Sequence, residues 1–343
     1  MKISNFSKIT TNILGSRLTG FVRDVLLANF LGANVLSDAF LFAYRLPNLF
    51  RRIFAEGAVN SVFIPMYVNL EKENKNLSND FIWFVFIIFF IFTSLLTIFV
   101  FAFNAQVISI LAPGFVDNES QFNLASILLP ITFPFLIFVT LSAILSSVLN
   151  TKGSFFLPSF LSLILNIFMI VSLLIFKSDS YIPLAWSMIM AGLVQLFLLF
   201  INLSFLKITW KLSLNSFSKI LPKLVIFFKR FFYSVIGSGI VQLNIFISMI
   251  FASLVGQGSI SHIYYADRII DLPFALIAVA MSITLLPYLS KNILDENKNA
   301  EAFNQTIIFC YIFALPSSFA IFFLASDIVQ VLFGRGEFLD SDV

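Results

Sequence analysis

The sequence is dominated by long, uninterrupted apolar stretches. The hydrocarbon core of a bilayer is about 30 Å thick, and a helix needs roughly 20 apolar residues to cross it. Nine stretches of this length occur, near residues 9–30, 38–70, 81–103, 124–149, 155–176, 182–206, 231–255, 263–289 and 303–333. Membrane-spanning strands alternate in polarity, whereas these stretches are continuously apolar. The sequence therefore predicts an all-α, polytopic membrane protein.

The composition argues against the soluble protein classes. Only 11% of the residues are charged and 59% are hydrophobic, whereas soluble domains have roughly 25% charged residues. This excludes a soluble enzyme, a nucleic-acid-binding domain and a disordered protein. The single cysteine, Cys310, excludes a disulfide framework and a cysteine-based metal site. The sequence has no P-loop, HExxH or GxSxG motif, so we expect no enzymatic activity, no metal, no cofactor and no nucleic-acid partner.

The distribution of Lys and Arg predicts the orientation in the membrane. If the N-terminus is cytoplasmic, the cytoplasmic segments hold thirteen basic residues and the opposite segments hold only Lys177 and Arg335. Cytoplasmic loops collect Lys and Arg, so we expect a cytoplasmic N-terminus. The first span lacks the pattern of a cleaved signal peptide, and we expect it to be retained.

A weak internal repeat occurs at an offset of about 223 residues. Leu31-Gly32 matches Val255-Gly256, Ala43-Tyr44-Arg45 matches Ala266-Asp267-Arg268, and Phe115 matches Phe338. The offset covers six predicted helices, so the two copies share one topology, as in two-lobed transporters.

This repeat divides the chain into predicted parts. We expect an N-terminal lobe at 1–206 with helices one to six, a basic linker at 207–230, and a partial C-terminal lobe at 231–343 with helices seven to nine. At least three further helices are expected in the full protein. The basic residues of the linker fit either binding to anionic headgroups at the membrane surface or the positive-inside rule alone.

Six arginines lie within predicted spans: Arg17, Arg23, Arg45, Arg51, Arg52 and Arg268. Charge at the centre of a span costs about 2.5–3.5 kcal/mol even on insertion scales, so such residues are functional candidates. Four acids are available as pairing partners: Asp24, Asp38, Glu56 and Asp267. One interpretation is a set of structural ion pairs. The excess of arginine favours a cationic cavity for an anionic group, because the planar guanidinium makes bidentate bonds to phosphate.

Several segments carry a specific resemblance to a known family. They are GSRLTGFVRD at 15–24, SDAF at 37–40 and LPNLFRRIFAEGA at 46–58, with further matches at APGF (112–115) and YYADR (264–268). Over essentially its whole length the sequence resembles the MurJ/MviN lipid II flippases of the multidrug/oligosaccharidyl-lipid/polysaccharide exporter superfamily. Family members have two six-helix lobes and usually two further helices, so the resemblance implies that roughly the last five helices are missing here.

The resemblance also implies a function in cell-wall biogenesis. Lipid II, the undecaprenyl-diphosphate-linked peptidoglycan precursor, would move by alternating access from the inner to the outer leaflet of the bacterial inner membrane. The residues that the resemblance assigns to the diphosphate are Arg17, Arg23, Arg51 and Arg268. Those that it assigns to the cavity or to gating are Asp24, Asp38, Glu56, Arg45, Arg52 and Asp267. Expected partners are lipid II, membrane lipids, a coupling ion and other cell-wall synthesis proteins.

Other functions stay open at this point. An exporter of another polyprenyl-diphosphate glycan would need the same headgroup chemistry. A drug exporter for cations would need a carboxylate-rich cavity, against which the arginine excess argues. A scaffold that binds lipid intermediates without moving them would be favoured if the natural gene ended near Val343.

Overall fold

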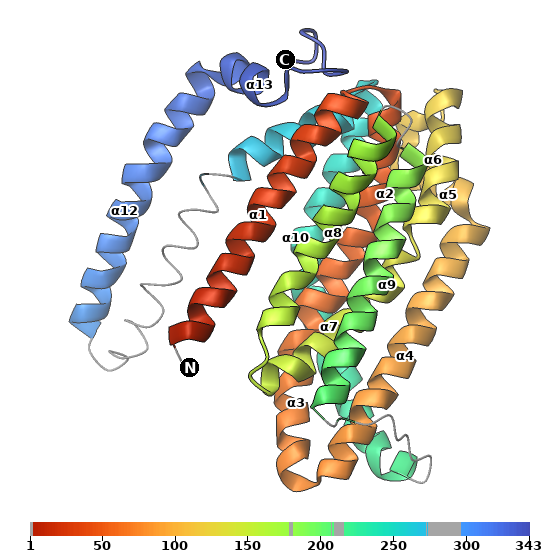
Figure 1. Ribbon diagram of the computed structural model, residues 1–343, viewed down its shortest axis with the longest axis vertical. Helices are drawn as coiled ribbons and strands as arrows, with labels where there is room; N and C mark the ends of the chain where they lie inside the picture. Colours follow the sequence, from red (N-terminus) through yellow and green to blue (C-terminus); the bar gives the residue numbers. More distant parts are fainter. Residues whose placement is uncertain (1–2, 178–180, 207, 209–215, 272, 274–295) are drawn as a thin grey trace.

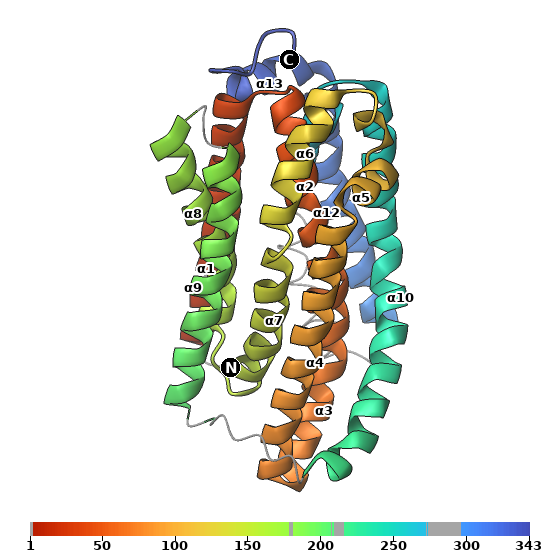
Figure 2. The same ribbon diagram turned by 90° about the vertical axis from the view of Figure 1, so that its right-hand side faces the viewer.

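The computed structural model is a bundle of helices that run along its long axis (Figures 1 and 2). It describes residues 3–177, 181–206, 208, 216–271, 273 and 296–343, without the side chains at 3–11, 13, 55–58 and 296–298. Every regular element in these ranges is helical. The prediction of an all-α fold is therefore confirmed.

The part of the chain up to residue 205 forms the elements α1 to α9. The elements are α1 (Ile3–Leu31), α2 (Val35–Arg51), a π-helical segment η1 (Arg52–Val59), α3 (Asn60–Glu73), α4 (Lys75–Ala102), α5 (Asn104–Leu111), a 3₁₀ turn η2 (Pro113–Phe115), α6 (Glu119–Thr132), α7 (Phe135–Thr151), α8 (Phe156–Phe176) and α9 (Tyr181–Phe205). The elements that follow are α10 (Phe217–Val255), the helical residues 259–271, α12 (Glu296–Phe323) and α13 (Ala325–Phe333).

Six helical stretches among the described residues are long and apolar enough to cross a membrane: Lys75–Ala102, Glu119–Thr151, Phe156–Phe176, Tyr181–Phe205, Phe217–Val255 and Asn299–Phe323. Apolar side chains are exposed on α4 and α10, among them Ile98, Phe101, Ile240 and Phe251. Such surfaces are stable in lipid and not in water. The chain is a multi-pass membrane protein.

Pro47 of the second predicted span lies inside α2, and π-helical turns follow at η1. Proline has no N–H to donate to the carbonyl four residues earlier, which belongs to Ala43. That carbonyl instead accepts a hydrogen bond from the buried Thr132 hydroxyl of α6 at 2.8 Å. The neighbouring helix thus replaces the missing bond, and α2 stays intact to Arg51.

Other boundaries differ in the second half of the chain. Helix α10 begins at Phe217 instead of 231, so the later basic residues of the predicted linker lie on its first turns. Residues 207 and 209–215 of that linker lie outside the described residues, as do 272 and 274–289 of the eighth predicted span. The ninth predicted span is divided at Leu324 into α12 and α13.

The internal repeat is visible in equivalent aromatic contacts. Phe115 packs edge-on against Phe42, with ring centroids 5.6 Å apart, and Phe338 packs in the same way against Tyr265 at 5.5 Å. Both members of the second pair follow those of the first by 223 residues (265 − 42 and 338 − 115). The two copies therefore fold alike at these positions, as the parallel repeat predicts.

A loop of each copy also contacts the other copy at the upper end of the bundle, where α13 and the C-terminus lie (Figure 1). The Gly114 N–H donates to Ser253 Oγ of α10 at 3.2 Å, and the Glu337 N–H donates to the Asn29 carbonyl of α1 at 2.9 Å. Reciprocal contacts of this kind are those of an isologous two-fold interface. We call them the loop clasp. A Cβ at Gly114 would overlap the Ser253 carbonyl, so only glycine permits this approach.

Candidate functional site

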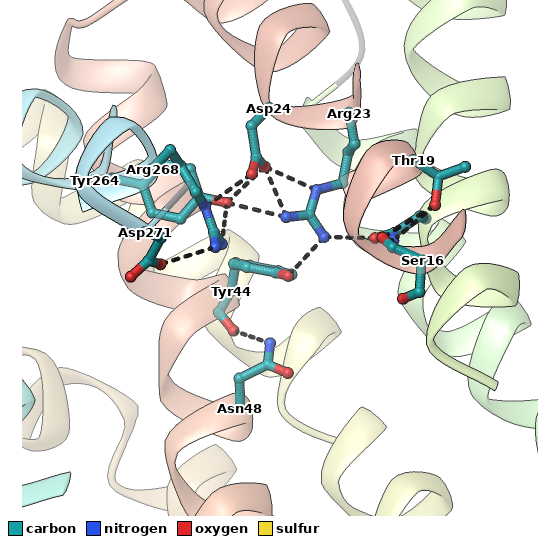
Figure 3. A network of polar contacts seen from close by, with 10 residues as sticks. Ser16, Thr19, Arg23, Asp24, Tyr44, Asn48, Tyr264, Arg268 and Asp271 are labelled. Atoms are coloured by element: carbon teal, nitrogen blue, oxygen red, sulfur yellow. Dashed lines mark hydrogen bonds and ion pairs between the residues drawn. The ribbon is translucent and has the colours of Figure 1, made fainter. Parts of the chain in front are cut away.

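Two arginines of the predicted spans meet at one buried carboxylate, that of Asp24 (Figure 3). Arg23 Nη2 lies 2.6 Å from Asp24 Oδ1, and Arg268 Nε lies 2.8 Å from Asp24 Oδ2. Arg23 and Asp24 belong to α1, whereas Arg268 belongs to the helix at 259–271. This arrangement, which we call the arginine cluster, therefore joins the two lobes. The Arg23 and Asp24 side chains are 5% and 1% exposed, and that of Arg268 is 30% exposed.

The phenol of Tyr264 lies at the centre of the arginine cluster. Its hydroxyl accepts hydrogen bonds from Arg23 Nη2 and Arg268 Nη2, both at 3.1 Å, and donates to Asp24 Oδ1 at 2.7 Å. Its ring centroid lies 4.9 Å from the Arg45 guanidinium and 4.8 Å from that of Arg268. Both distances fit cation–π contacts. Tyr264 thus fixes the relative positions of two cations and one anion.

Two further side chains complete the environment of Arg23. Its Nη1 donates to Tyr44 Oη at 2.9 Å and to Asn166 Oδ1 at 2.8 Å. Asn166 belongs to α8 and donates in turn to the Ser16 carbonyl of α1 at 3.0 Å. Together with the bonds to Asp24 and Tyr264, all five guanidinium N–H donors of Arg23 are used. An incoming anion would have to replace one of these acceptors.

Tyr44, Tyr264 and Asn166 were not among the predicted site residues. A tyrosine or asparagine within an apolar helix is most often a packing residue, and neither carries the charge that made the arginines stand out. The signals that could have found the tyrosines are two: Tyr44 and Tyr264 lie within one turn of the arginines Arg45 and Arg268, and Tyr264 belongs to the YYADR match at 264–268.

The remaining arginines of α2 and η1 lie at or below the cluster. Arg45 Nη2 lies 3.4 Å from the exposed carboxylate of Asp267. Arg51 Nε donates to Asn48 Oδ1 at 3.2 Å, and Arg52 is exposed. The backbone of Glu56 lies in η1, but its side chain is outside the described residues.

Asp38 lies at the upper end and has only neutral hydrogen-bond donors. Its Oδ1 accepts from the Ser261 N–H at 2.8 Å and the Ser261 hydroxyl at 2.6 Å, and its Oδ2 accepts from the Gly258 N–H at 2.7 Å and Gln121 Nε2 at 3.1 Å. The carboxylate thereby caps the helix at 259–271 from another part of the chain, as an N-cap side chain would. Asp38 and Ser261 are equivalent positions of the repeat, so this bond lies between the two copies.

Arg17 lies apart from the arginine cluster. It lines a groove of about 450 Å³ between α1 and the start of α8, together with Ser16, Asn150, Phe155, Pro158, Ser159 and Ser162. Of the four arginines that the resemblance assigns to the diphosphate, the structure thus brings together Arg23 and Arg268, and places Arg17 and Arg51 elsewhere.

Comparisons with known proteins agree with the resemblance seen in the sequence. The sequence model of the family described as "Lipid II flippase MurJ" matches residues 27–343. A "Probable lipid II flippase MurJ" of Buchnera aphidicola (Acyrthosiphon pisum, strain APS) is 37% identical over 335 residues, which are 96% of this chain and 65% of that protein. Another, from Aquifex aeolicus, is 36% identical over 336 residues, 96% of this chain and 64% of that protein.

Solved structures show the same fold. A structure described as "Lipid II flippase MurJ, inward closed conformation" matches with a TM-score of 0.84 and 28% identity, over 97% of this chain and 69% of that chain. A structure described as an inward-facing multidrug resistance MATE family transporter of the MOP superfamily matches with a TM-score of 0.68 and 16% identity, over 95% of this chain and 74% of that one, which shows the fold alone. The chain spans about 65% of the length of the first curated relatives it matches.

Proposed function

Because this chain belongs to the lipid II flippase MurJ family, we propose that its arginine cluster holds the diphosphate of lipid II during transport across the bacterial inner membrane. The observation that carries the proposal is the convergence of Arg23 and Arg268 on the single carboxylate of Asp24. Two guanidinium groups face one buried carboxylate, and the exposed carboxylate of Asp271 lies 3.7 Å from Arg268 Nη1. The buried groups of this centre thus carry a charge of +1 (2 − 1). An additional anion is therefore favoured there.

The different exposure of the two arginines defines the order in which a diphosphate contacts them. Arg268 is partly exposed and retains donor capacity, so a phosphate oxygen meets this residue first. Arg23 has no spare donor, so the phosphate reaches it by replacing one of its acceptors. Asp24 is the anionic one of these and takes two of the five donors. Since Arg23 and Arg268 belong to different lobes, a ligand that binds both arginines bridges the lobes. Its binding is coupled to their relative position, as alternating access requires.

Arg17 and Arg51 lie where the lipid headgroup would pass on its way to the cluster. Arg17 precedes Arg23 by six residues on α1, which is about 9 Å along the helix axis. Arg51 follows Tyr44 by seven residues on α2, about 10 Å in the same direction because α2 runs antiparallel to α1. With the N-terminus in the cytoplasm, both lie on the cytoplasmic side of the cluster, where the headgroup arrives. Arg45, Arg52, Asp267, Glu56 and Asp38 act in the cavity wall or in gating, and the lobes at 1–206 and 231–343 move about the linker.

No bond is made or broken in this process, so the chain acts as a carrier and not as an enzyme. The direction of transport requires an energy source, and charge moved through the membrane potential supplies about 2.3 kcal/mol per elementary charge per 100 mV. A coupling ion or contact with other cell-wall synthesis proteins would act on the same inter-lobe equilibrium.

The test is lipid II binding by the purified protein and two variants that lose the same charge. Arg268→Gln removes the exposed arginine of the cluster, whereas Arg335→Gln removes an exposed arginine from the loop at the upper end. We expect Arg268→Gln to weaken binding about tenfold or more, since hydrogen bonds to charged groups contribute about 1.5–3 kcal/mol. Arg335→Gln should bind like the native protein. Equal binding by all three proteins contradicts the proposal.

A second polyprenyl-diphosphate glycan separates this function from that of a sister exporter. The cluster recognises the diphosphate and not the sugar. Tighter binding of lipid II than of the other glycan supports the assignment of lipid II, and the reverse order supports the sister exporter. Flipping of labelled lipid II in vesicles that contain the protein distinguishes a transporter from a scaffold.

A further inference from the structure

Arg52 is an arginine that neither the arginine cluster nor the packing of the described residues uses. It is the first residue of η1, and its side chain is exposed. In the part of the chain that the structure describes, no hydrogen bond or ion pair holds its guanidinium. Arg45, seven residues earlier, is instead engaged by the Asp267 carboxylate at 3.4 Å and by the ring of Tyr264 at 4.9 Å. The donors of Arg52 are therefore available to a ligand.

The backbone at Arg52 is anchored from the opposite side of the helix. Phe50 and Phe54 lie two residues before and after it, and therefore about 160° away around the helix axis. The Phe50 ring packs edge-on against Phe246 of α10, with centroids 6.0 Å apart, and the Phe54 ring packs against Phe92 of α4 at 5.4 Å. These contacts fix the turn and leave the Arg52 side chain on its free face.

The position of Arg52 relative to the arginine cluster follows from helix geometry. Arg45 and Arg52 are seven residues apart, so they share one face of the helix and are separated by about 10 Å along its axis. Arg45 contacts the ring of Tyr264, whose hydroxyl belongs to the cluster. In the orientation proposed above, Arg52 lies on the cytoplasmic side. A ligand that reaches both places therefore carries two anionic groups on the order of 10 Å apart.

The donors at Arg52 favour a carboxylate as the second anionic group. A single guanidinium presents a planar fork that matches one carboxylate with two parallel hydrogen bonds. The cluster, with two guanidinium groups, suits the more highly charged diphosphate. The headgroup of a peptidoglycan precursor carries a peptide in addition to the diphosphate and sugar. A peptide joined to the sugar through its amino end has a free carboxylate at its other end.

We propose that Arg52 binds a peptide carboxylate of lipid II and thereby distinguishes lipid II from polyprenyl diphosphates that lack a peptide. The arginine cluster contacts the diphosphate, which all of these lipids share, whereas Arg52 contacts the part in which they differ. The inference rests on the proposed function, because it takes lipid II as the ligand and the arginine cluster as the place of its diphosphate.

Binding of three ligands to the purified chain in detergent tests the proposal. The ligands are undecaprenyl diphosphate, lipid II, and lipid II whose peptide carboxylates are converted to amides. Arg52→Gln removes the charge, Arg52→Lys retains it, and Arg335→Gln is the matched charge control. The salt concentration is 0.15 M, at which exposed charges more than about 8 Å apart are largely screened from each other.

We expect Arg52→Gln to weaken lipid II binding about tenfold and to leave the binding of the other two ligands unchanged. Arg52→Lys should bind lipid II more tightly than Arg52→Gln, and Arg335→Gln should bind all three ligands like the native chain. If Arg52→Gln weakens the binding of all three ligands equally, or of none, the proposal is overturned.

Arg268→Gln separates a failure of this proposal from a failure of the proposed function. This variant should weaken the binding of all three ligands, since each carries the diphosphate. Unchanged binding of undecaprenyl diphosphate by Arg268→Gln would contradict the role of the arginine cluster. A loss of lipid II affinity that is confined to Arg52→Gln and absent with the amidated ligand would still support the carboxylate contact.

Discussion

Asp24 and Asp38 are both buried and both connect the first lobe to the helix at 259–271, yet their partners differ in kind. Asp24 is surrounded by two guanidinium groups and a phenol, all side chains on flexible stems. Asp38 is bound by two backbone N–H groups, a hydroxyl and an amide. The cations at Asp24 also attract any other anion in that place, whereas the backbone donors at Asp38 belong to a helix end that needs its cap.

This difference separates an exchangeable carboxylate from a structural one. A diphosphate carries more charge than a carboxylate and can replace it between Arg23 and Arg268. At Asp38, next to the loop clasp, the donors are enclosed by Ser37, Ser261 and Gln121, all of them buried. Asp38 therefore closes the upper end, and the arginine cluster below it is where an anionic ligand acts.

The largest effect on stability is expected for Asp24→Asn. The substitution keeps the size of the side chain but leaves two buried or half-buried guanidinium groups without their anion, which costs about 3–5 kcal/mol. Thermal unfolding in detergent should show this loss in the ligand-free protein. Undecaprenyl diphosphate should restore much of it, because its phosphate takes the place of the carboxylate. A loss that the ligand does not reduce would show that Asp24 is as structural as Asp38.

Asp38→Ala is expected to have the second largest effect and to lower the free energy of unfolding by about 2–4 kcal/mol, since it leaves buried N–H groups of Gly258 and Ser261 without an acceptor. The same lipid should not restore this stability beyond its effect on the native protein. Asp38→Asn, which keeps one acceptor oxygen, is the milder control. Rescue of Asp38→Ala by the diphosphate would remove the distinction between the two carboxylates.

Gly114→Ala tests whether the loop clasp closes the upper end. The added Cβ overlaps the Ser253 carbonyl, and we expect the strain to lower the free energy of unfolding by about 1–3 kcal/mol. Gly237→Ala on α10 is the matched control, because a Cβ there meets nothing within 4 Å. Unfolding temperatures of the two variants give the comparison. Equal stability of both would mean that the loops separate at no cost.

Tyr264→Phe is expected to have the smallest effect on stability and a selective effect on binding. It removes the hydroxyl that holds Arg23, Arg268 and Asp24 together, and we expect diphosphate binding to weaken about tenfold. Tyr265→Phe is the control, since that hydroxyl makes one bond of 3.3 Å to the Gly32 carbonyl. The same loss of affinity in both variants would argue against a positioning role for Tyr264.

The sequence was sufficient for those features that carry a free-energy penalty. A buried charge is costly in a membrane, so Arg23, Asp24 and Arg268 stood out, and continuous apolar stretches located most of the helices. The internal repeat was also readable, because matched pairs such as Phe115 and Phe338 occupy equivalent places.

What the sequence did not reveal depends on contacts between distant helices. Thr132 replaces the hydrogen bond that Pro47 lacks, but nothing near Pro47 indicates this. Asn166 is separated from Arg23 by 143 residues, so its role follows only from the packing of α8 against α1. For the same reason the separation of Arg17 from the arginine cluster was not predicted: helical periodicity gives relative angles within α1, but not which helix faces each side.

The affinity of Asp24→Asn for undecaprenyl diphosphate tests the central claim most directly. If the ligand takes the place of the carboxylate, removal of that competing charge makes the centre more positive by one unit and should tighten binding, whereas Arg268→Gln should weaken it. Both affinities can be measured under the same detergent and salt conditions as for the native protein. Weaker binding by Asp24→Asn would contradict the account, because it would make the carboxylate a requirement for binding and not a group that the diphosphate displaces.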